Sequence, residues 1–85
     1  MPARTAVVAS RIGLHARPAS LVSLAAASTG VPMLLEAHGR SVNAASILGI
    51  LSLDVSHGDE VTVSADDPAA VDALIALLER DLTED

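Results

Sequence analysis

The chain has 85 residues and contains no cysteine, phenylalanine, tyrosine or tryptophan. This length supports one hydrophobic core, so we expect a single domain over residues 1–85, with a core built from 16 Ala, 12 Leu, 9 Val and 4 Ile. A hydrophobic content of 51% excludes a disordered chain, and the lack of cysteine excludes disulfides, a thiol nucleophile and thiolate metal sites.

We expect neither a membrane segment nor an export signal. Its apolar runs span only a few residues, too few for a transmembrane helix. Residues 1–5 lack the long apolar block of a signal peptide. We therefore expect a cytoplasmic protein without membrane insertion.

The net charge of −6 is unevenly distributed along the chain. Three basic residues, Arg4, Arg11 and Arg17, precede the first acidic residue, whereas residues 43–85 hold ten acids against Arg80. This asymmetry predicts an anion site in the first half. An acidic chain without aromatic residues or a long basic run is a poor nucleic-acid binder, so we expect no nucleic-acid partner.

In the first half the pattern predicts a strand over 5–9, a turn over 10–14 and a helix that begins near Ala16. Pro18 is compatible with the first helical turn, and Gly30 is a plausible C-terminal cap. Apolar or small residues at a spacing of three to four predict the buried face of this helix: Leu21, Leu24, Ala25 and Ser28.

The second half favours strands over 33–37 and 40–42, joined by a turn at His38 and Gly39. A short helix over 44–53 and an alternating strand over 60–65 follow. Asp67 is a good N-cap for a final helix that begins at Pro68. Five apolar residues predict its buried stripe: Val71, Leu74, Ile75, Leu78 and Leu82.

The resulting order is βαββαβα. It predicts an α+β fold, an open-faced two-layer sandwich in which a four-stranded antiparallel sheet has three helices on one face.

Residues 13–20, Gly-Leu-His-Ala-Arg-Pro-Ala-Ser, place His15 between a glycine-containing loop and a helix N-terminus. There the backbone N–H groups of Ala16 and Arg17 and the helix dipole favour an anion. The Arg17 guanidinium can hold two phosphate oxygens, and a neutral imidazole is a competent nucleophile. These are the parts needed for phosphoryl transfer to a histidine. The alternative is that His15 merely caps the helix.

This segment resembles the active-site signature of HPr, the histidine-containing phosphocarrier family of the bacterial phosphoenolpyruvate:sugar phosphotransferase system. Ser46-Ile47-Leu48-Gly49 is similar to the second, regulatory phosphorylation site of that family. Length and element order fit along the whole chain.

The resemblance implies that His15 accepts a phosphoryl group on Nδ1 from phospho-Enzyme I and passes it to the IIA component of a sugar permease. Arg17 would neutralise the phosphate. The protein would be a carrier that is regenerated, not a stand-alone enzyme, and would need no metal or organic cofactor. We expect it to be a monomer.

Two positions depart from the family pattern. Many relatives have Asn or Ser before the glycine, where this chain has Ile12, which cannot orient the imidazole. We therefore expect an altered phosphohistidine lifetime. Ala45 stands where several relatives have Lys, which weakens the prediction that an HPr kinase/phosphorylase recognises Ser46; near a helix start, Ser46 can also be only an N-cap.

The helix around Ser46 is apolar nearly all round, so some of its side chains must be exposed. Ile50 and Leu53 are the expected core residues. The partner-binding surface is predicted to contain Ile47, Leu48 and Leu51 from this helix, together with Leu14 beside His15.

Other functions have weaker support in the sequence. An HPr-like regulatory protein, for example of a nitrogen-branch system, would act mainly by protein binding. A self-contained phosphatase is disfavoured because no second acid or base accompanies His15, and the carboxylates of the second half fit solvated faces and caps. His38 and His57 fit turns better than metal ligands.

Overall fold

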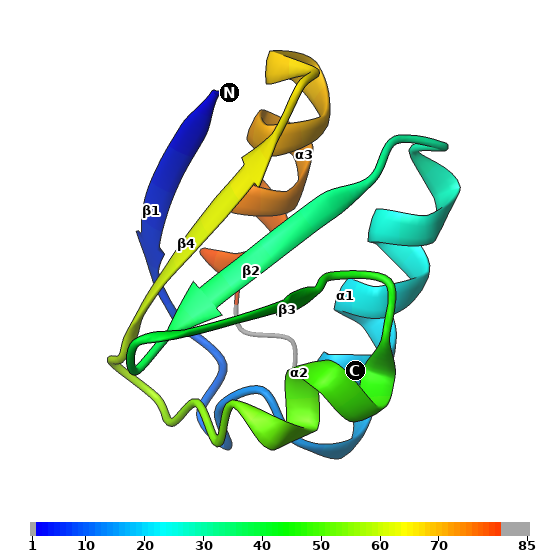
Figure 1. Cartoon of the computed structure of the whole chain (residues 1–85). Helices are drawn as coiled ribbons and strands as arrows, with labels where there is room; N and C mark the ends of the chain where they lie inside the picture. Colours follow the sequence, from blue (N-terminus) through cyan, green and yellow to red (C-terminus); the bar gives the residue numbers. More distant parts are fainter. Residues whose placement is uncertain (1, 81–85) are drawn as a thin grey trace.

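The computed structural model describes residues 2–80. The elements follow the order βαββαβα (Figure 1). Their bounds are β1 Ala3–Val7, α1 Ala16–Ser28, β2 Met33–Ala37, β3 Arg40–Asn43, α2 Ile47–Ser52, β4 Glu60–Ala65 and α3 Pro68–Leu78. The predicted α+β fold class is confirmed.

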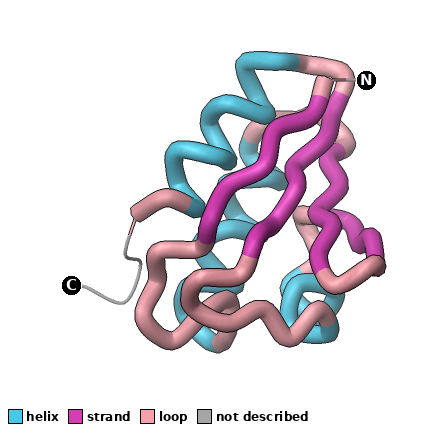
Figure 2. Tube along the Cα trace, turned by 90° about the vertical axis from the view of Figure 1, so that its left-hand side faces the viewer, coloured by secondary structure: helices cyan, strands magenta, loops and turns pink. Residues whose placement is uncertain are grey.

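The strands form one sheet in the order β1-β4-β2-β3, and every neighbouring pair is antiparallel. The helices form a second layer on one face of this sheet (Figure 2). α3 packs on β1 and β4, while α1 lies against α3 and α2. Because only one face is covered, buried and exposed side chains alternate along β2 and β4.

The core between the two layers is entirely aliphatic apart from Met33. The larger side chains that are fully buried include Leu35 and Val63 from the sheet and Leu74, Ile75 and Leu78 from α3. The stripe predicted for the last helix is therefore confirmed through Leu78, and Leu82 lies outside the described residues. No helix in the described part of the chain is long and apolar enough to cross a membrane.

The buried face of α1 differs from the predicted one. The helix buries Pro18, Ala19, Val22, Ser23 and Ala26. Leu24, predicted to be buried, is 64% exposed, and Leu21 is only partly buried. In a helix this rich in alanine, small side chains can face the core while leucines remain exposed at its edge. The positions of the leucines therefore predicted the wrong face.

Several local predictions are confirmed. His38 and Gly39 both have positive φ, 53° and 75°, in the tight turn between β2 and β3. Gly30, at φ 71°, follows the end of α1. The Asp67 carboxylate accepts a hydrogen bond from Ala69 N–H and caps α3. β1 begins two residues earlier than expected, at Ala3, because its pairing with β4 extends to Ser64.

Candidate functional site

His15 is the N-cap residue of α1, with extended backbone angles (φ −117°, ψ 160°). Its side chain forms no capping hydrogen bond to the helix. The imidazole is 43% exposed, so solvent and a partner protein can reach it. The interpretation of His15 as merely a helix cap is therefore wrong.

The first residue of α1 after His15 is conformationally strained. Ala16 has φ 45°, in the left-handed region, which costs an L-residue roughly 1–2 kcal/mol. Backbone N–H groups in the first turn have no acceptor within the helix, and here they belong to Ala16 and Arg17, because Pro18 has no N–H. The expected arrangement of an imidazole beside donors at a helix N-terminus is present.

The loop before His15 is fixed against the segment that precedes β4. Gly13, at φ 72°, lies so close to this segment that an added Cβ would overlap the carbonyl oxygen of Val55. The next residue, Leu14, donates its N–H to the same oxygen at 3.0 Å. Backbone contact thus determines where His15 lies.

Leu14 does not belong to the partner-binding surface. Its side chain is fully buried, in the same hydrophobic core as Val55 and Ile50. The prediction that Leu14 contacts a partner is therefore wrong. Local hydrophobicity beside His15 suggested a surface contact, whereas the leucine anchors the loop from inside.

The structure brings an acidic residue to His15 that the sequence did not indicate. Asp54 Oδ1 lies 3.6 Å from His15 Nε2. The Asp54 side chain is 87% exposed, and its backbone is left-handed, with φ 53°. The expectation that no acid or base accompanies His15 is therefore wrong, although the Asp54 carboxylate is solvated, as expected for the acids of the second half. Only the fold could reveal this contact, because the two residues are far apart along the chain.

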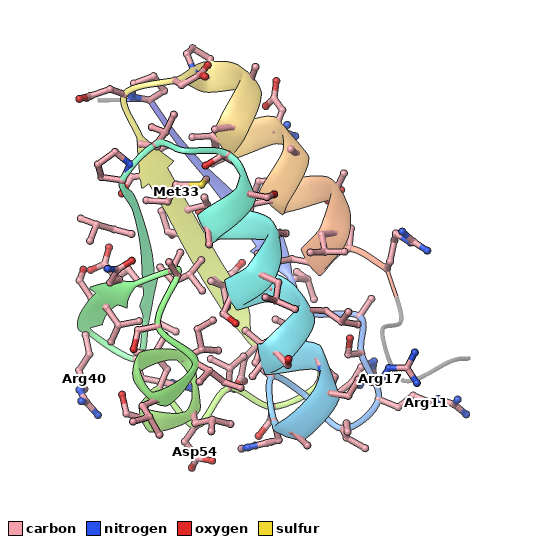
Figure 3. The ribbon with its side chains drawn as sticks, turned by 90° about the vertical axis from the view of Figure 1, so that its right-hand side faces the viewer. Arg11, Arg17, Met33, Arg40 and Asp54 are labelled. Atoms are coloured by element: carbon pink, nitrogen blue, oxygen red, sulfur yellow. The ribbon has the colours of Figure 1, made fainter. Side chains whose placement is uncertain are left out.

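Two of the five arginines have partners away from His15. Arg4 on β1 forms an ion pair with Asp72 on α3 at 2.7 Å. Arg40 donates to the carbonyl oxygen of Ser52 at the end of α2. In the view of Figure 3, the side chains of Arg11 and Arg17 both point to one side of the first turn of α1, whereas Asp54 lies on the other side. The positive charge inferred from the sequence thus gathers on one side of the site.

An open hollow borders Asp54 on the side of the turn between β2 and β3. Its volume is about 440 Å³, and polar side chains from that turn and from the segment after α2 form most of its wall. Its lining residues include His38, Arg40, Asp54 and Asp59, but not His15. His38 Nε2 lies 3.1 Å from Asp59 Oδ2, so the histidine of this turn already has a carboxylate neighbour.

Ser46 is the N-cap of α2, and its hydroxyl accepts a hydrogen bond from Gly49 N–H at 3.0 Å. The capping role predicted for it is therefore confirmed. Gly49 permits this approach, since a Cβ on it would lie 3.3 Å from the Ser46 hydroxyl oxygen. Any modification of Ser46 would act on an atom that already stabilises the helix.

Exposed apolar side chains lie on α2 and in the loop before His15. Leu48 is 76% exposed and Ile47 38%, as predicted, whereas Leu51 is only partly buried against the core. Ile50 and Leu53 are buried, again as predicted. Ile12, in the loop before His15, is 53% exposed.

His57 is exposed in the loop before β4, consistent with a turn residue. Across residues 2–80, no three side chains of histidine, aspartate or glutamate lie close enough together to hold a metal ion.

The open-faced sandwich, with a half-exposed histidine at the start of its first helix, defines a small phosphocarrier protein. The family model described as PTS HPr component phosphorylation site matches residues 2–80. The chain therefore belongs to the HPr family, the phosphocarriers of the phosphotransferase system.

Individual relatives agree with this assignment. The phosphocarrier protein HPr of Streptomyces coelicolor is 48% identical over 63 residues, which cover 73% of this chain and 68% of the relative. The crystal structure of HPr-C-His from Thermoanaerobacter tengcongensis has a TM-score of 0.91 at 39% identity and covers 100% of this chain and 99% of that one. An HPr dimer from the same organism has a TM-score of 0.70 at 40% identity, covering 93% and 94%.

Proposed function

We propose that His15 is the phosphoacceptor: it receives a phosphoryl group on Nδ1 from phospho-Enzyme I and passes it to the IIA component of a sugar permease. The observation that carries this proposal is the half-exposed imidazole at the N-terminal end of α1, with no capping bond to occupy it. His38 and His57 lie in turns, and neither precedes a helix. The role is therefore assigned to His15 alone.

The neighbouring groups supply the electrostatic part of the reaction. The Ala16 and Arg17 N–H groups at the helix N-terminus can donate to the phosphate oxygens, and the helix dipole stabilises an anion there by about 0.3–1 kcal/mol. The Arg17 guanidinium adds a full positive charge in a geometry that suits two oxygens. Such pre-oriented donors favour the charge distribution of the transferring phosphoryl group. The step needs no metal or organic cofactor, because the donor is itself a phosphorylated protein.

The partner surface in this proposal surrounds His15 and α2. Leu48 and Ile47 provide exposed apolar area, and Leu51 contributes at its edge. Enzyme I and the IIA component would bind this same surface in turn, which suits a carrier that must release each partner. We assign the protein to the cytoplasm and expect it to act as a monomer.

Ser46 is proposed as the regulatory site, modified by an HPr kinase/phosphorylase. A phosphate there would add nearly two negative charges at the start of α2, beside the apolar partner surface. The charge is tolerable for the helix but would oppose an acidic partner. Inhibition would then follow without refolding.

The test is to incubate the protein with Enzyme I and phosphoenolpyruvate and to measure its mass. We expect a gain of one acid-labile phosphate in the wild type, in His38→Ala and in His57→Ala, but none in His15→Ala. A phosphate that persists in His15→Ala would overturn the assignment. If no Enzyme I transfers phosphate to the wild type, the protein acts as an HPr-like regulator through binding alone.

A further inference from the structure

A carboxylate faces the imidazole nitrogen that the proposed reaction leaves free. Asp54 Oδ1 lies 3.6 Å from His15 Nε2, whereas the phosphoryl group is assigned to Nδ1. An ionised carboxylate can only accept hydrogen bonds, so it favours the imidazole tautomer whose N–H points toward it. The neutral imidazole then carries its proton on Nε2 and its lone pair on Nδ1.

Both the backbone conformation and the charge of Asp54 are unfavourable at this position. It directly follows the C-cap residue of α2, Leu53, and its N–H donates to the Leu51 carbonyl oxygen at 3.2 Å. Its left-handed φ of 53° is a conformation that glycine or asparagine adopts more readily at the end of a helix. A negative charge is also unfavourable at a helix C-terminus. Neither α2 nor its end is stabilised by this carboxylate, whereas an imidazole lies within ion-pair distance of it.

The contact is held by backbone interactions on both sides. Asp54 immediately precedes Val55, whose carbonyl oxygen accepts the Leu14 N–H, and Leu14 immediately precedes His15. The side chains of Leu14 and Val55 are both fully buried. His15 and Asp54 therefore extend outward from two segments that are hydrogen-bonded to each other and anchored in the core.

We propose that Asp54 is a positioning residue for the phosphoacceptor: its carboxylate holds the His15 ring with the proton on Nε2 and so presents the Nδ1 lone pair to the phosphoryl donor. This inference rests on the proposed function, in which Nδ1 is the atom phosphorylated. Orientation of a nucleophilic or basic imidazole by a carboxylate on its far nitrogen is a general device of enzyme chemistry.

The same carboxylate stabilises the product of the transfer. The Nδ1 lone pair forms the new N–P bond, while the bond from phosphorus to the phosphorylated donor protein breaks and its electron pair leaves with the donor atom. The ring keeps its proton on Nε2 and becomes positively charged. The Asp54 carboxylate then faces a positively charged ring and lowers its energy.

Three variants separate the effects of the Asp54 charge, its side-chain shape and its backbone strain. Asp54→Asn keeps the side-chain shape and suits the left-handed backbone, but removes the charge. Asp54→Gly removes the side chain and relieves the backbone strain, so it is expected to fold at least as well as the wild type. Asp66→Asn changes the net charge by the same amount at an exposed position in the turn after β4, and is the matched control.

The decisive readout is the pair of ¹⁵N chemical shifts of the His15 ring in the unphosphorylated protein, which report the ratio of the two neutral tautomers. The measurement is made near pH 9, well above the reference imidazole pKa of about 6.5. The ratio of the Nε2–H to the Nδ1–H form should be highest in the wild type and in Asp66→Asn. It should fall about two- to fivefold in Asp54→Asn and Asp54→Gly, which corresponds to roughly 0.4–1 kcal/mol. An unchanged ratio in both variants would overturn the proposal.

The phosphorylation rate by Enzyme I gives the second readout. We expect a loss of about two- to fivefold in the Asp54 variants and none in Asp66→Asn. A slower rate with an unchanged tautomer ratio would assign Asp54 to partner docking and contradict the positioning role. Because the tautomer measurement needs no partner or phosphate, it stands or falls separately from the identity of the phosphoacceptor, which the His15→Ala mass measurement tests.

Discussion

The backbone of Gly13 lies against Val55 so closely that a Cβ on Gly13 would come within 2.2 Å of the Val55 carbonyl oxygen. Glycine is therefore required here for two reasons, the close approach and the positive φ of 72°. The same approach places His15 beside Asp54, so a change at Gly13 acts on both the fold and the site.

Gly13→Ala should lower the free energy of unfolding by at least about 2 kcal/mol, because left-handed strain adds to overpacking against backbone. Urea denaturation measures this loss. Gly30→Ala is the matched control: its φ is 71°, but no atom lies within 4 Å of the added Cβ. It should cost only about 1–2 kcal/mol, since left-handed strain alone remains. Equal losses in the two variants would contradict the close approach at Gly13.

Leu14→Ala should destabilise the protein by about 2–5 kcal/mol, the usual range for a leucine removed from a packed core. The side chain is fully buried, so its loss leaves a cavity rather than a missing partner contact. Urea denaturation again provides the measurement. A variant with normal stability but weakened Enzyme I binding would instead restore Leu14 to the partner surface.

Leu48→Asp should weaken Enzyme I binding at least about fivefold if Leu48 belongs to the proposed partner surface, because a charge would then replace an apolar contact. Stability should change by no more than about 0.5 kcal/mol, because the side chain is 76% exposed. Titration calorimetry and thermal melting give the two quantities. Leu34→Asp, at a 40% exposed position on β2, is the control and should leave Enzyme I binding unchanged. A large loss of stability in Leu48→Asp would place Leu48 in the core.

Ser46→Ala should cost about 1 kcal/mol of stability because the hydrogen bond to Gly49 N–H is lost. Ser46→Asp should be as stable as the wild type, since aspartate is an equally good N-cap and its charge suits the helix N-terminus. Its phosphorylation by Enzyme I should nevertheless be slower. Equal phosphotransfer rates in Ser46→Asp and the wild type would count against a regulatory effect of charge at this position.

The order and type of the elements were predictable because they depend on local patterns. Alternation predicted β4 from Glu60 to Ala65, and the Asp67-Pro68 pair predicted the start of α3. The buried face of α1 was not predictable in the same way. Its alanines fit either face, and packing against the rest of the core, rather than residue size, decided between them.

In the candidate site, too, local features were predictable and long-range contacts were not. His15 and its neighbours are contiguous in sequence, so a motif could reveal them. The role of Leu14 as an anchor depends on the distant Val55, and the contact between His15 and Asp54 depends on two loops meeting in space. Only one local feature distinguishes Asp54 from the other acids of the second half. Its position directly after α2, where glycine or asparagine is more usual, was the one available signal.

The absence of aromatic residues from the core has a practical consequence for spectroscopy. Because the chain contains no tryptophan or tyrosine, it contributes almost nothing to absorbance or fluorescence near 280 nm. In a mixture with Enzyme I, any such signal reports the partner alone. Conversely, a single tryptophan placed at the exposed Leu48 would be the only intrinsic fluorophore of this protein, and a change in its emission on addition of Enzyme I would test whether this surface is the one that binds.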